Sequence, residues 1–243
     1  MTRKPFVLFD LGGTLVDLRG LAVSMAVQLS AIHVRGPVRT ALLWTSGTAA
    51  RLPAAQGPQF RSVREIAQDV LFELLQTRGR ANAREESARL VREAWSEFVR
   101  TCSFQPDVTA DWLHGLRSRV AALGLVTDSD SEAAAGVLAH LGLGDSFDSV
   151  IVSEEVRAYK PDPRIYRAAL KALEAEASAS LFVSDAALDL RGAAKLGLGA
   201  AWIRRGLVPD SVKPPPQTLV LKSLQDVERI VAGYAKSGRF RLR

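Results

Sequence analysis

The feature that most constrains this chain is a short apolar run that ends in an acid and then turns at once. Residues 6–9 read Phe-Val-Leu-Phe, Asp10 follows them, and glycines at positions 12 and 13 permit a sharp turn. An unbroken apolar run is typical of a parallel strand that is buried on both faces. Open α/β sheets bind and transform ligands at the carboxyl ends of such strands. The run therefore predicts an α/β fold with Asp10 in its functional site.

Short apolar runs alternate with segments of helical period in the second half of the chain, which is the pattern of βαβ units in a parallel sheet. Strands are predicted at 6–10, 121–127, 149–153, 181–184 and 200–203, with a weaker one at 218–221. Helices are predicted at 131–141, 163–173, 188–195 and 225–234. We therefore expect a Rossmann-like, doubly wound parallel sheet.

The region between the first two strands has a different pattern. Apolar residues recur there at helical spacing, as in Ile66, Val70 and Leu74, and strand-like runs are absent. This predicts an all-helical cap, residues 18–105, inserted into a core of residues 1–17 and 106–243. Because the insert begins just after Asp10, we expect the cap to cover the site and to select the substrate.

Composition narrows the classes of function. A chain of 243 residues with 47% hydrophobic content can bury one α/β core and an insert. The net charge of +6 could attract small anions, and no basic patch with interleaved aromatics indicates nucleic-acid binding. A lone cysteine excludes an intrachain disulfide, and we find neither a signal-peptide pattern nor a membrane-length apolar run. We expect a cytoplasmic protein, a monomer or homodimer, that binds a small molecule and neither nucleic acid nor membrane.

Further polar residues stand at or just after predicted strand ends, or before a helix. They are Thr127 and Asp128 after the second strand, Lys160 before a helix that begins at a proline, and Asp185 and Asp189 after the fourth strand. With Asp10 they resemble, in order, the four motifs of the haloacid dehalogenase-like (HAD) superfamily. Residues 146–150 and 200–204 are also similar to that family, so the resemblance covers the whole core. It implies a Rossmann-like fold with a helical cap of the C1 type.

The resemblance implies that Asp10 is a nucleophile. A carboxylate can form an acyl-phosphate and so divide one difficult displacement into two steps. Lys160 would neutralise both Asp10 and the transferring oxygens, while Thr127, Asp128 and the backbone N–H of Gly13 would bind the phosphate. Thr127 could instead satisfy the local backbone. The main expectation is hydrolysis of a small phosphorylated metabolite through an aspartyl-phosphate.

The acids of the fourth motif indicate a magnesium site. Mg²⁺ prefers hard oxygen ligands and completes its shell with water and substrate phosphate. The resemblance implies a metal held by Asp10, by the Gly12 carbonyl and by Asp185, with Asp189 bound directly or through water. Asp189 could instead be a charge at a helix N-terminus.

The chain departs from the phosphatase pattern at position 12. Phosphatases of the family carry a second aspartate there, which protonates the leaving oxygen and later activates water. A positioned acid–base contributes about 10²–10⁴-fold in rate, and Gly12 cannot supply it. Asp17 and Asp128 are the nearby candidates, and neither is favoured over the other.

Two alternatives follow from this departure. Haloacid dehalogenases use the same aspartate to attack carbon, need no metal and lack the second aspartate. Tyr166, six residues after the lysine, and Ser184 resemble their pattern. The other alternative is a catalytically weak HAD-like binding module.

Four differences oppose the dehalogenase interpretation. Gly12 stands where an aromatic residue is expected, Ala186 replaces an asparagine, and Asp185 is an additional carboxylate. The cap arginine that would bind a haloacid carboxylate could be Arg35 or Arg39, whose surroundings do not resemble that pattern.

Overall fold

The computed structural model describes residues 4–205 and 212–241. Its core is a six-stranded parallel sheet with the strand order β3-β2-β1-β4-β5-β6. The strands are β1 (Phe6–Phe9), β2 (Ala122–Thr127), β3 (Ser149–Val152), β4 (Ser180–Ser184), β5 (Gly199–Ile203) and β6 (Leu219–Leu221). The predicted strands are all present. The chain moves outward from β1 on one side and then restarts on the other, so the switch point of the topology lies beside β1.

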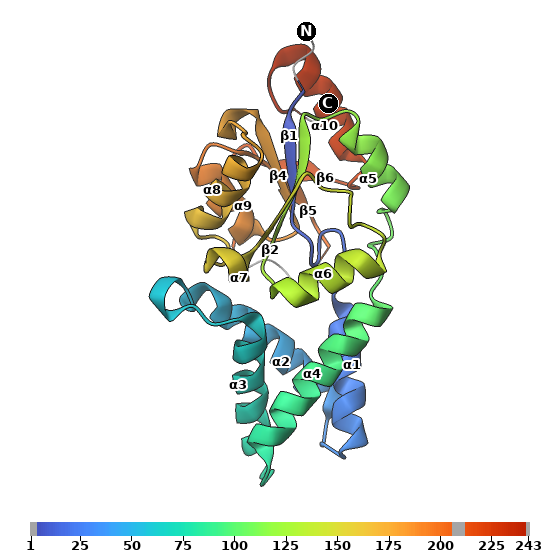
Figure 1. Ribbon diagram of the computed structural model, residues 1–243, viewed down its shortest axis with the longest axis vertical. Coiled ribbons are helices and arrows are strands. Elements are labelled where there is room, and N and C mark those ends of the chain that lie inside the picture. Colours follow the sequence, from blue (N-terminus) through green and yellow to red (C-terminus); the bar gives the residue numbers. More distant parts are fainter. Residues whose placement is uncertain (1–3, 206–211, 242–243) are drawn as a thin grey trace.

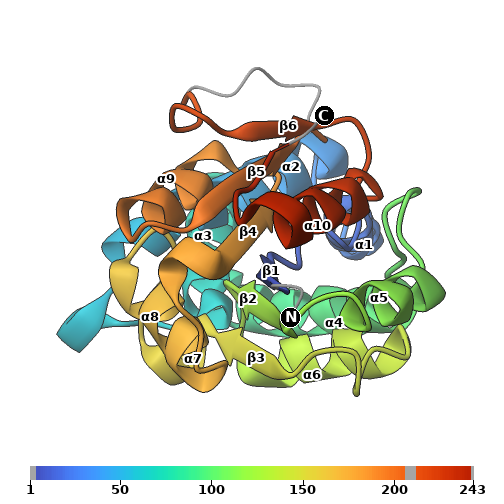
Figure 2. The ribbon, with the colours of Figure 1, turned by 90° about the horizontal axis from the view of Figure 1, so that it is seen from above.

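Helices cover both faces of the sheet (Figure 2). On one face, α8 (Pro163–Ala172) and α9 (Ala187–Lys195) pack against Leu8 of β1. On the other face lie α5 (Ala110–Arg117), α6 (Ser131–His140) and α10 (Asp226–Ser237), which pack against Val7 and Phe9. Neighbouring strand residues point to opposite faces, so a strand covered on both sides must be apolar throughout. The predicted doubly wound Rossmann-like core is confirmed.

Helix α5 was not predicted from the sequence. Its eight residues include Gly115, and only Leu113 and Leu116 are buried in the core, which is too short a pattern to establish a helical period. The helix begins at Thr109, whose side-chain oxygen accepts a hydrogen bond from the Trp112 N–H at 3.1 Å. The other short elements are α7 (Ser153–Val156) and the single turns η1 (Leu52–Ala54), η2 (Gly57–Gln59) and η3 (Ala177–Ala179).

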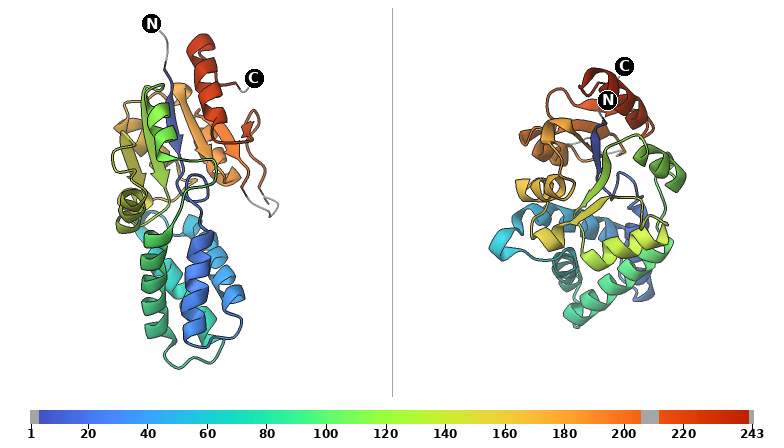
Figure 3. Two further views of the ribbon diagram at one scale, coloured as in Figure 1. Left: turned by 90° about the vertical axis from the view of Figure 1, so that its right-hand side faces the viewer. Right: turned by 45° about the horizontal axis from the view of Figure 1, so that its top comes forward.

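Four helices between β1 and β2 form a separate layer at the carboxyl ends of the strands (Figures 1 and 3). They are α1 (Arg19–Ala31), α2 (Pro37–Arg51), α3 (Val63–Gln76) and α4 (Ala83–Thr101). They enclose a hydrophobic cluster that includes Met25, Trp44 and Leu71, and the Trp44 indole N–H donates to the Ala67 carbonyl at 2.9 Å. The helices lie within the predicted cap, whose boundaries at residues 18 and 105 stay a prediction.

Polar and aromatic contacts join this helical layer to the core. The Asp130 carboxylate accepts hydrogen bonds from the backbone N–H groups of Val63 at 2.7 Å and Arg64 at 3.0 Å, so a core residue caps the start of α3. The Tyr159 ring stacks on Phe60 with 5.0 Å between centroids. These contacts fix the cap over the carboxyl ends of the strands. Among the described residues, no helix has both the length and the hydrophobicity needed to cross a bilayer.

Candidate active site

Asp10 lies one residue beyond β1, in the middle of the sheet. Its backbone N–H donates to the Val183 carbonyl of β4 at 3.0 Å, and the residue is 5% exposed. The chain then turns back on itself, because the N–H groups of Leu15 and Val16 both donate to the Leu11 carbonyl. This tight turn holds the Asp10 carboxylate at the carboxyl edge of the sheet.

Gly13 gives the turn its shape, and its backbone N–H bears on one prediction. Its φ of +83° is a conformation that favours glycine, and a Cβ there would lie 2.4 Å from Oδ2 of Asp185. Its N–H donates to the Val16 carbonyl at 2.8 Å, so that donor already has an acceptor within the fold, and the role of Gly13 in substrate binding stays a prediction. The N–H groups of Leu11 and Gly12 have no acceptor within residues 4–205 and 212–241, and both residues line the cavity described below.

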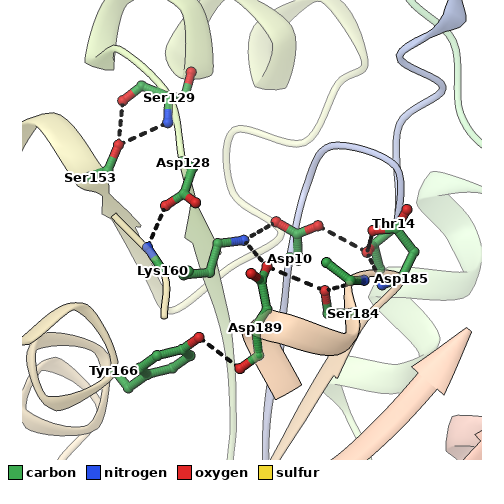
Figure 4. A network of polar contacts seen from close by, with 11 residues as sticks. Asp10, Thr14, Asp128, Ser129, Ser153, Lys160, Tyr166, Ser184, Asp185 and Asp189 are labelled. Atoms are coloured by element: carbon green, nitrogen blue, oxygen red, sulfur yellow. Dashed lines mark hydrogen bonds and ion pairs between the residues drawn. The ribbon is translucent and has the colours of Figure 1, made fainter. Parts of the chain in front are cut away.

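Lys160 stands among the carboxylates (Figure 4). Its Nζ atom contacts Oδ1 of Asp10 and lies 2.9 Å from Oδ2 of Asp189, and its side chain is only 2% exposed. Its backbone N–H donates to Oδ1 of Asp128 at 3.0 Å. Lys160 therefore binds two carboxylates through its ammonium group and a third through its backbone N–H.

The electrostatics of the site follow from burial. Burial opposes the charge on Lys160, yet attraction by Asp10, Asp189 and Asp128 outweighs it and holds the pKa of Lys160 well above its usual value. Burial raises the pKa of both Asp128 and Asp185 to about 7, and it raises that of Asp10 as well. The ammonium group thus compensates only part of the negative charge that the fold collects here.

Thr14 links the first and fourth motifs. Its hydroxyl donates to Oδ2 of Asp10 at 3.0 Å, lies 3.2 Å from Oδ1 of Asp185 and accepts the Asp185 N–H at 2.9 Å. The Trp202 indole N–H donates to the Asp185 carbonyl at 2.9 Å. Sequence reasoning did not assign Thr14 a role. The signal that could have found it is its place, four residues after Asp10, in the run that resembles the first motif of the family.

A second group of contacts positions Asp189. The Tyr166 hydroxyl donates to the Asp189 carbonyl at 2.8 Å, and burial raises the pKa of this phenol, which keeps it protonated. Ser184 Oγ lies 3.5 Å from the Asp189 carboxylate and accepts the Ala186 N–H at 3.0 Å. The Asp189 side chain is therefore held toward Lys160.

A cavity of about 1100 Å³ opens between the cap and the core. Its catalytic end is lined by the predicted residues Asp10, Gly12, Thr127, Asp128, Lys160, Asp185 and Asp189. Gly13 is absent from the lining. Asp17 is also absent and pairs with Arg19, so of the two candidate acids only Asp128 faces the cavity. Arg35 and Arg39 do not line it.

The donors near Asp10 have the chemistry that a magnesium ion requires. Asp10 and Asp185 offer two carboxylates, and the Gly12 carbonyl accepts no hydrogen bond from any described residue. Within the described part of the chain, no three His, Cys, Asp or Glu side chains converge as a metal cluster. Mg²⁺ is usually held by one or two carboxylates together with water and substrate. This small donor set therefore fits the ion, while Asp189 is engaged by Lys160.

The arrangement of a strand-end aspartate, a buried lysine and an acidic fourth motif agrees with a comparison to protein families. The profile described as haloacid dehalogenase-like hydrolase matches residues 6–197. The chain belongs to this family of hydrolases. The predicted family, fold and enzyme class are thereby confirmed.

Individual relatives are of two kinds. The chain is 34% identical to an (S)-2-haloacid dehalogenase of Pseudomonas sp. strain YL over 131 residues, which cover 53% of this chain and 56% of the relative. It is 35% identical to a phosphoserine phosphatase of Thermus thermophilus over 136 residues, which cover 56% of this chain and 54% of the relative. The chain thus spans about half the length of the curated relatives it matches.

Solved structures share the whole fold. The L-2-haloacid dehalogenase of Xanthobacter autotrophicus superimposes with a TM-score of 0.77, at 20% identity, covering 95% of this chain and 99% of that one. At this level of identity the likeness establishes a common fold.

Proposed function

We propose that this hydrolase displaces a halide from C2 of a 2-haloacid. The observation that carries the proposal is the lack of a proton donor at position 12. Gly12 occupies it, and a Cβ built there would already lie 3.0 Å from the Leu18 side chain. A leaving group next to Asp10 must therefore depart without a proton from this position, as halide does. The haloacid dehalogenases among the relatives support the same reaction, which was the alternative rather than the main expectation from the sequence.

The first step is nucleophilic substitution at carbon. A carboxylate oxygen of Asp10 forms a bond to C2 of the substrate while the carbon–halogen bond breaks, and halide leaves with the bonding electrons. The free N–H groups of Leu11 and Gly12 and the Thr127 hydroxyl line the same end of the cavity. They are suited to bind the substrate carboxylate, in the role we first assigned to Gly13. Lys160 offsets the repulsion between that carboxylate and Asp10.

The second step is hydrolysis of the ester on Asp10. Asp189 lines the cavity and lies 2.9 Å from the Lys160 ammonium, so it can take a proton from water that attacks the ester carbonyl carbon. The acyl–oxygen bond then breaks and the leaving alkoxide takes the proton from Asp189, which releases the 2-hydroxyacid. The carboxyl group left on Asp10 gives its proton to solvent, which restores the carboxylate. This route gives both steps without an acid at position 12.

A second candidate is a magnesium-dependent phosphatase, and Asp185 favours it. The Thr14 hydroxyl lies between the carboxylates of Asp185 and Asp10. A substrate that carries only a carboxylate and a halide would offer the Asp185 carboxylate no group to bind. Asp10, Asp185 and the Gly12 carbonyl would hold Mg²⁺, and the ion would offset negative charge on the nucleophile and a phosphate. The phosphatase among the relatives supports this candidate. Without an acid at position 12, it would act on substrates with good leaving groups.

One experiment separates the candidates. Halide release from 2-bromopropanoate in EDTA and hydrolysis of p-nitrophenyl phosphate in Mg²⁺ are measured for the wild type, Asp10→Asn and Asp185→Asn. Dehalogenation that survives Asp185→Asn and is lost in Asp10→Asn supports the first candidate. Metal-dependent phosphate release that both substitutions abolish supports the second and refutes the first. Lack of both activities points to the binding module.

A further inference from the structure

The cavity continues from Asp10 along two cap helices. Most residues that line this extension have small or apolar side chains, and Ser30 of α1 and Thr45 and Thr48 of α2 add three hydroxyl groups. Six of the apolar residues form two helix faces. They are Ala22, Val23, Ala26 and Val27 on α1, and Val38 and Leu42 on α2. On each helix these positions recur at intervals of four residues and so lie on one face. The result is an apolar groove, defined by these six residues, that opens into the catalytic end of the cavity.

The groove is exposed to a degree that is unusual for aliphatic side chains. Val23, Val27 and Val38 are 61–62% exposed, and Leu42 is 56% exposed. Contiguous apolar surface that is continuous with a cavity marks a place where a partner is bound. Because the groove belongs to the same cavity as the nucleophile, its natural occupant is the part of the substrate that extends away from Asp10.

The charged side chains that line the cavity restrict the chemistry of the part of the substrate that extends away from Asp10. Among the described residues, the cavity is lined by two cations, Lys160 and Arg19. Lys160 is engaged by Asp10 and Asp189, and Arg19 is paired with Asp17. The groove therefore has no unpaired cation to offset a second anionic group of the substrate, and it favours an uncharged apolar chain.

The size of the cavity supports the same conclusion. Its volume of about 1100 Å³ lies slightly above the roughly 300–1,000 Å³ that encloses drug-sized ligands. The lined face of α1 runs from Arg19 to Ser30, which is about 16 Å along a helix that rises 1.5 Å per residue. A short haloacid would leave most of these apolar walls in contact with water.

We propose that the substrate is a 2-haloacid with a long alkyl chain, and that this chain lies in the groove between α1 and α2. The proposal rests on the proposed function for its reactive group, and on the groove for its chain. Each methylene that moves from water into an apolar site contributes about fourfold in affinity. We expect kcat/KM to rise by about that factor per methylene until the groove is filled.

The test compares 2-bromopropanoate, 2-bromohexanoate and 2-bromodecanoate in the wild type, Leu42→Asp and Leu43→Asp. Leu43 is a matched control, because it is 42% exposed on the same helix but does not line the cavity. In the wild type, kcat/KM should rise along the series. Leu42→Asp should lower the value for 2-bromodecanoate at least tenfold more than the value for 2-bromopropanoate, whereas Leu43→Asp should alter neither. A kcat/KM that does not change along the series, or an equal loss of kcat/KM in both variants, would overturn the proposal.

Binding of decanoate, measured by calorimetry, separates this proposal from the reaction itself. If no bromoacid is turned over, the proposed function fails, yet decanoate binding that is weakened only by Leu42→Asp still supports an apolar chain in the groove. If decanoate does not bind, the groove proposal fails whatever the activity. Sedimentation velocity tests a competing occupant. A wild-type dimer that Leu42→Asp alone dissociates would mean that a second copy of the chain covers the groove, and the proposal would be refuted.

Discussion

Replacing Lys160 by methionine should destabilise the folded protein by an amount that depends on pH. The Lys160 side chain is 2% exposed, and its ammonium contacts Asp10 and lies 2.9 Å from the carboxylate of Asp189. Methionine is also unbranched and flexible, so it fills much of the same space and removes the charge. The substitution therefore leaves buried carboxylates without their cation.

The expected magnitude is large. Removing one partner of a buried ion pair costs about 3–5 kcal/mol, because the remaining charge has lost both water and its counterion. A domain has only about 5–15 kcal/mol of total stability. At about pH 8, we expect Lys160→Met to lower the free energy of unfolding by about 3–5 kcal/mol.

The sign of the pH dependence follows from the carboxyl pKa values. Burial raises the pKa of Asp128 and Asp185 to about 7, and attraction by Lys160 opposes that rise, so both values should climb further in the variant. An acid whose pKa is higher in the folded protein than in the unfolded chain destabilises the fold at pH values above its folded-state pKa. At pH values below its unfolded-state pKa, it has no effect on stability. The pKa of Lys160 itself is raised, so its stabilising contribution is fully present below about 10.5. The penalty of the substitution should therefore shrink as the pH falls from about 8 to 5 and the carboxyl groups become protonated.

Urea unfolding of the two proteins at about pH 8 and pH 5.5, followed by circular dichroism, measures this difference. Lys171→Met is the control, because Lys171 is exposed on the adjacent helix α8 and should change stability by less than about 0.5 kcal/mol. A penalty for Lys160→Met that is the same at both pH values, or no larger than that of the control, would refute the charge argument.

Three further predictions concern the framework of the site. Gly13→Ala should reduce activity at least tenfold, because φ is +83° and the new Cβ would lie 2.4 Å from the Asp185 carboxylate; wild-type kcat/KM in this variant would contradict that reasoning. Asp130→Asn should weaken the attachment of the cap to the core by about 1–2 kcal/mol, since one side-chain acceptor of the Val63 and Arg64 N–H groups is lost. Hydrogen exchange at the start of α3 should accelerate, and unchanged exchange would contradict this prediction. Tyr166→Phe removes the hydroxyl donor to a carbonyl of α9; we expect kcat to fall severalfold with KM little altered, and a change confined to KM would contradict a positioning role.

Much of the fold was predictable because burial leaves a direct signature in a parallel sheet. Strands covered on both faces must be apolar throughout, so the runs that end at Asp10 and Ser184 could be recognised without a structure. An element that buries few residues leaves too weak an apolar pattern to be recognised from the sequence. Helix α5 buries two leucines in the core over eight residues and was missed.

The candidate site was predictable as a set of residues but not as an arrangement. Each motif follows a strand or precedes a helix, and parallel strands bring such ends to one edge of the sheet. Position along the chain does not reveal that Gly13 donates its N–H to Val16, that Asp17 pairs with Arg19, or that Thr14 lies between two carboxylates. Such contacts depend on turn geometry and on side-chain directions, which residue types leave open.

The sequence by itself determined the family and the class of fold and indicated Asp10 as the candidate nucleophile, because these depend on local patterns and on their order along the chain. The tertiary structure decided what surrounds Asp10. Thr14 and Asp185 are separated by 171 positions, and they meet because β1 pairs directly with β4. The apolar groove likewise exists only because the sides of α1 and α2 that line the cavity with Asp10 are left uncovered. Contacts between distant segments are set by strand order and helix packing, and these are properties of the assembled fold.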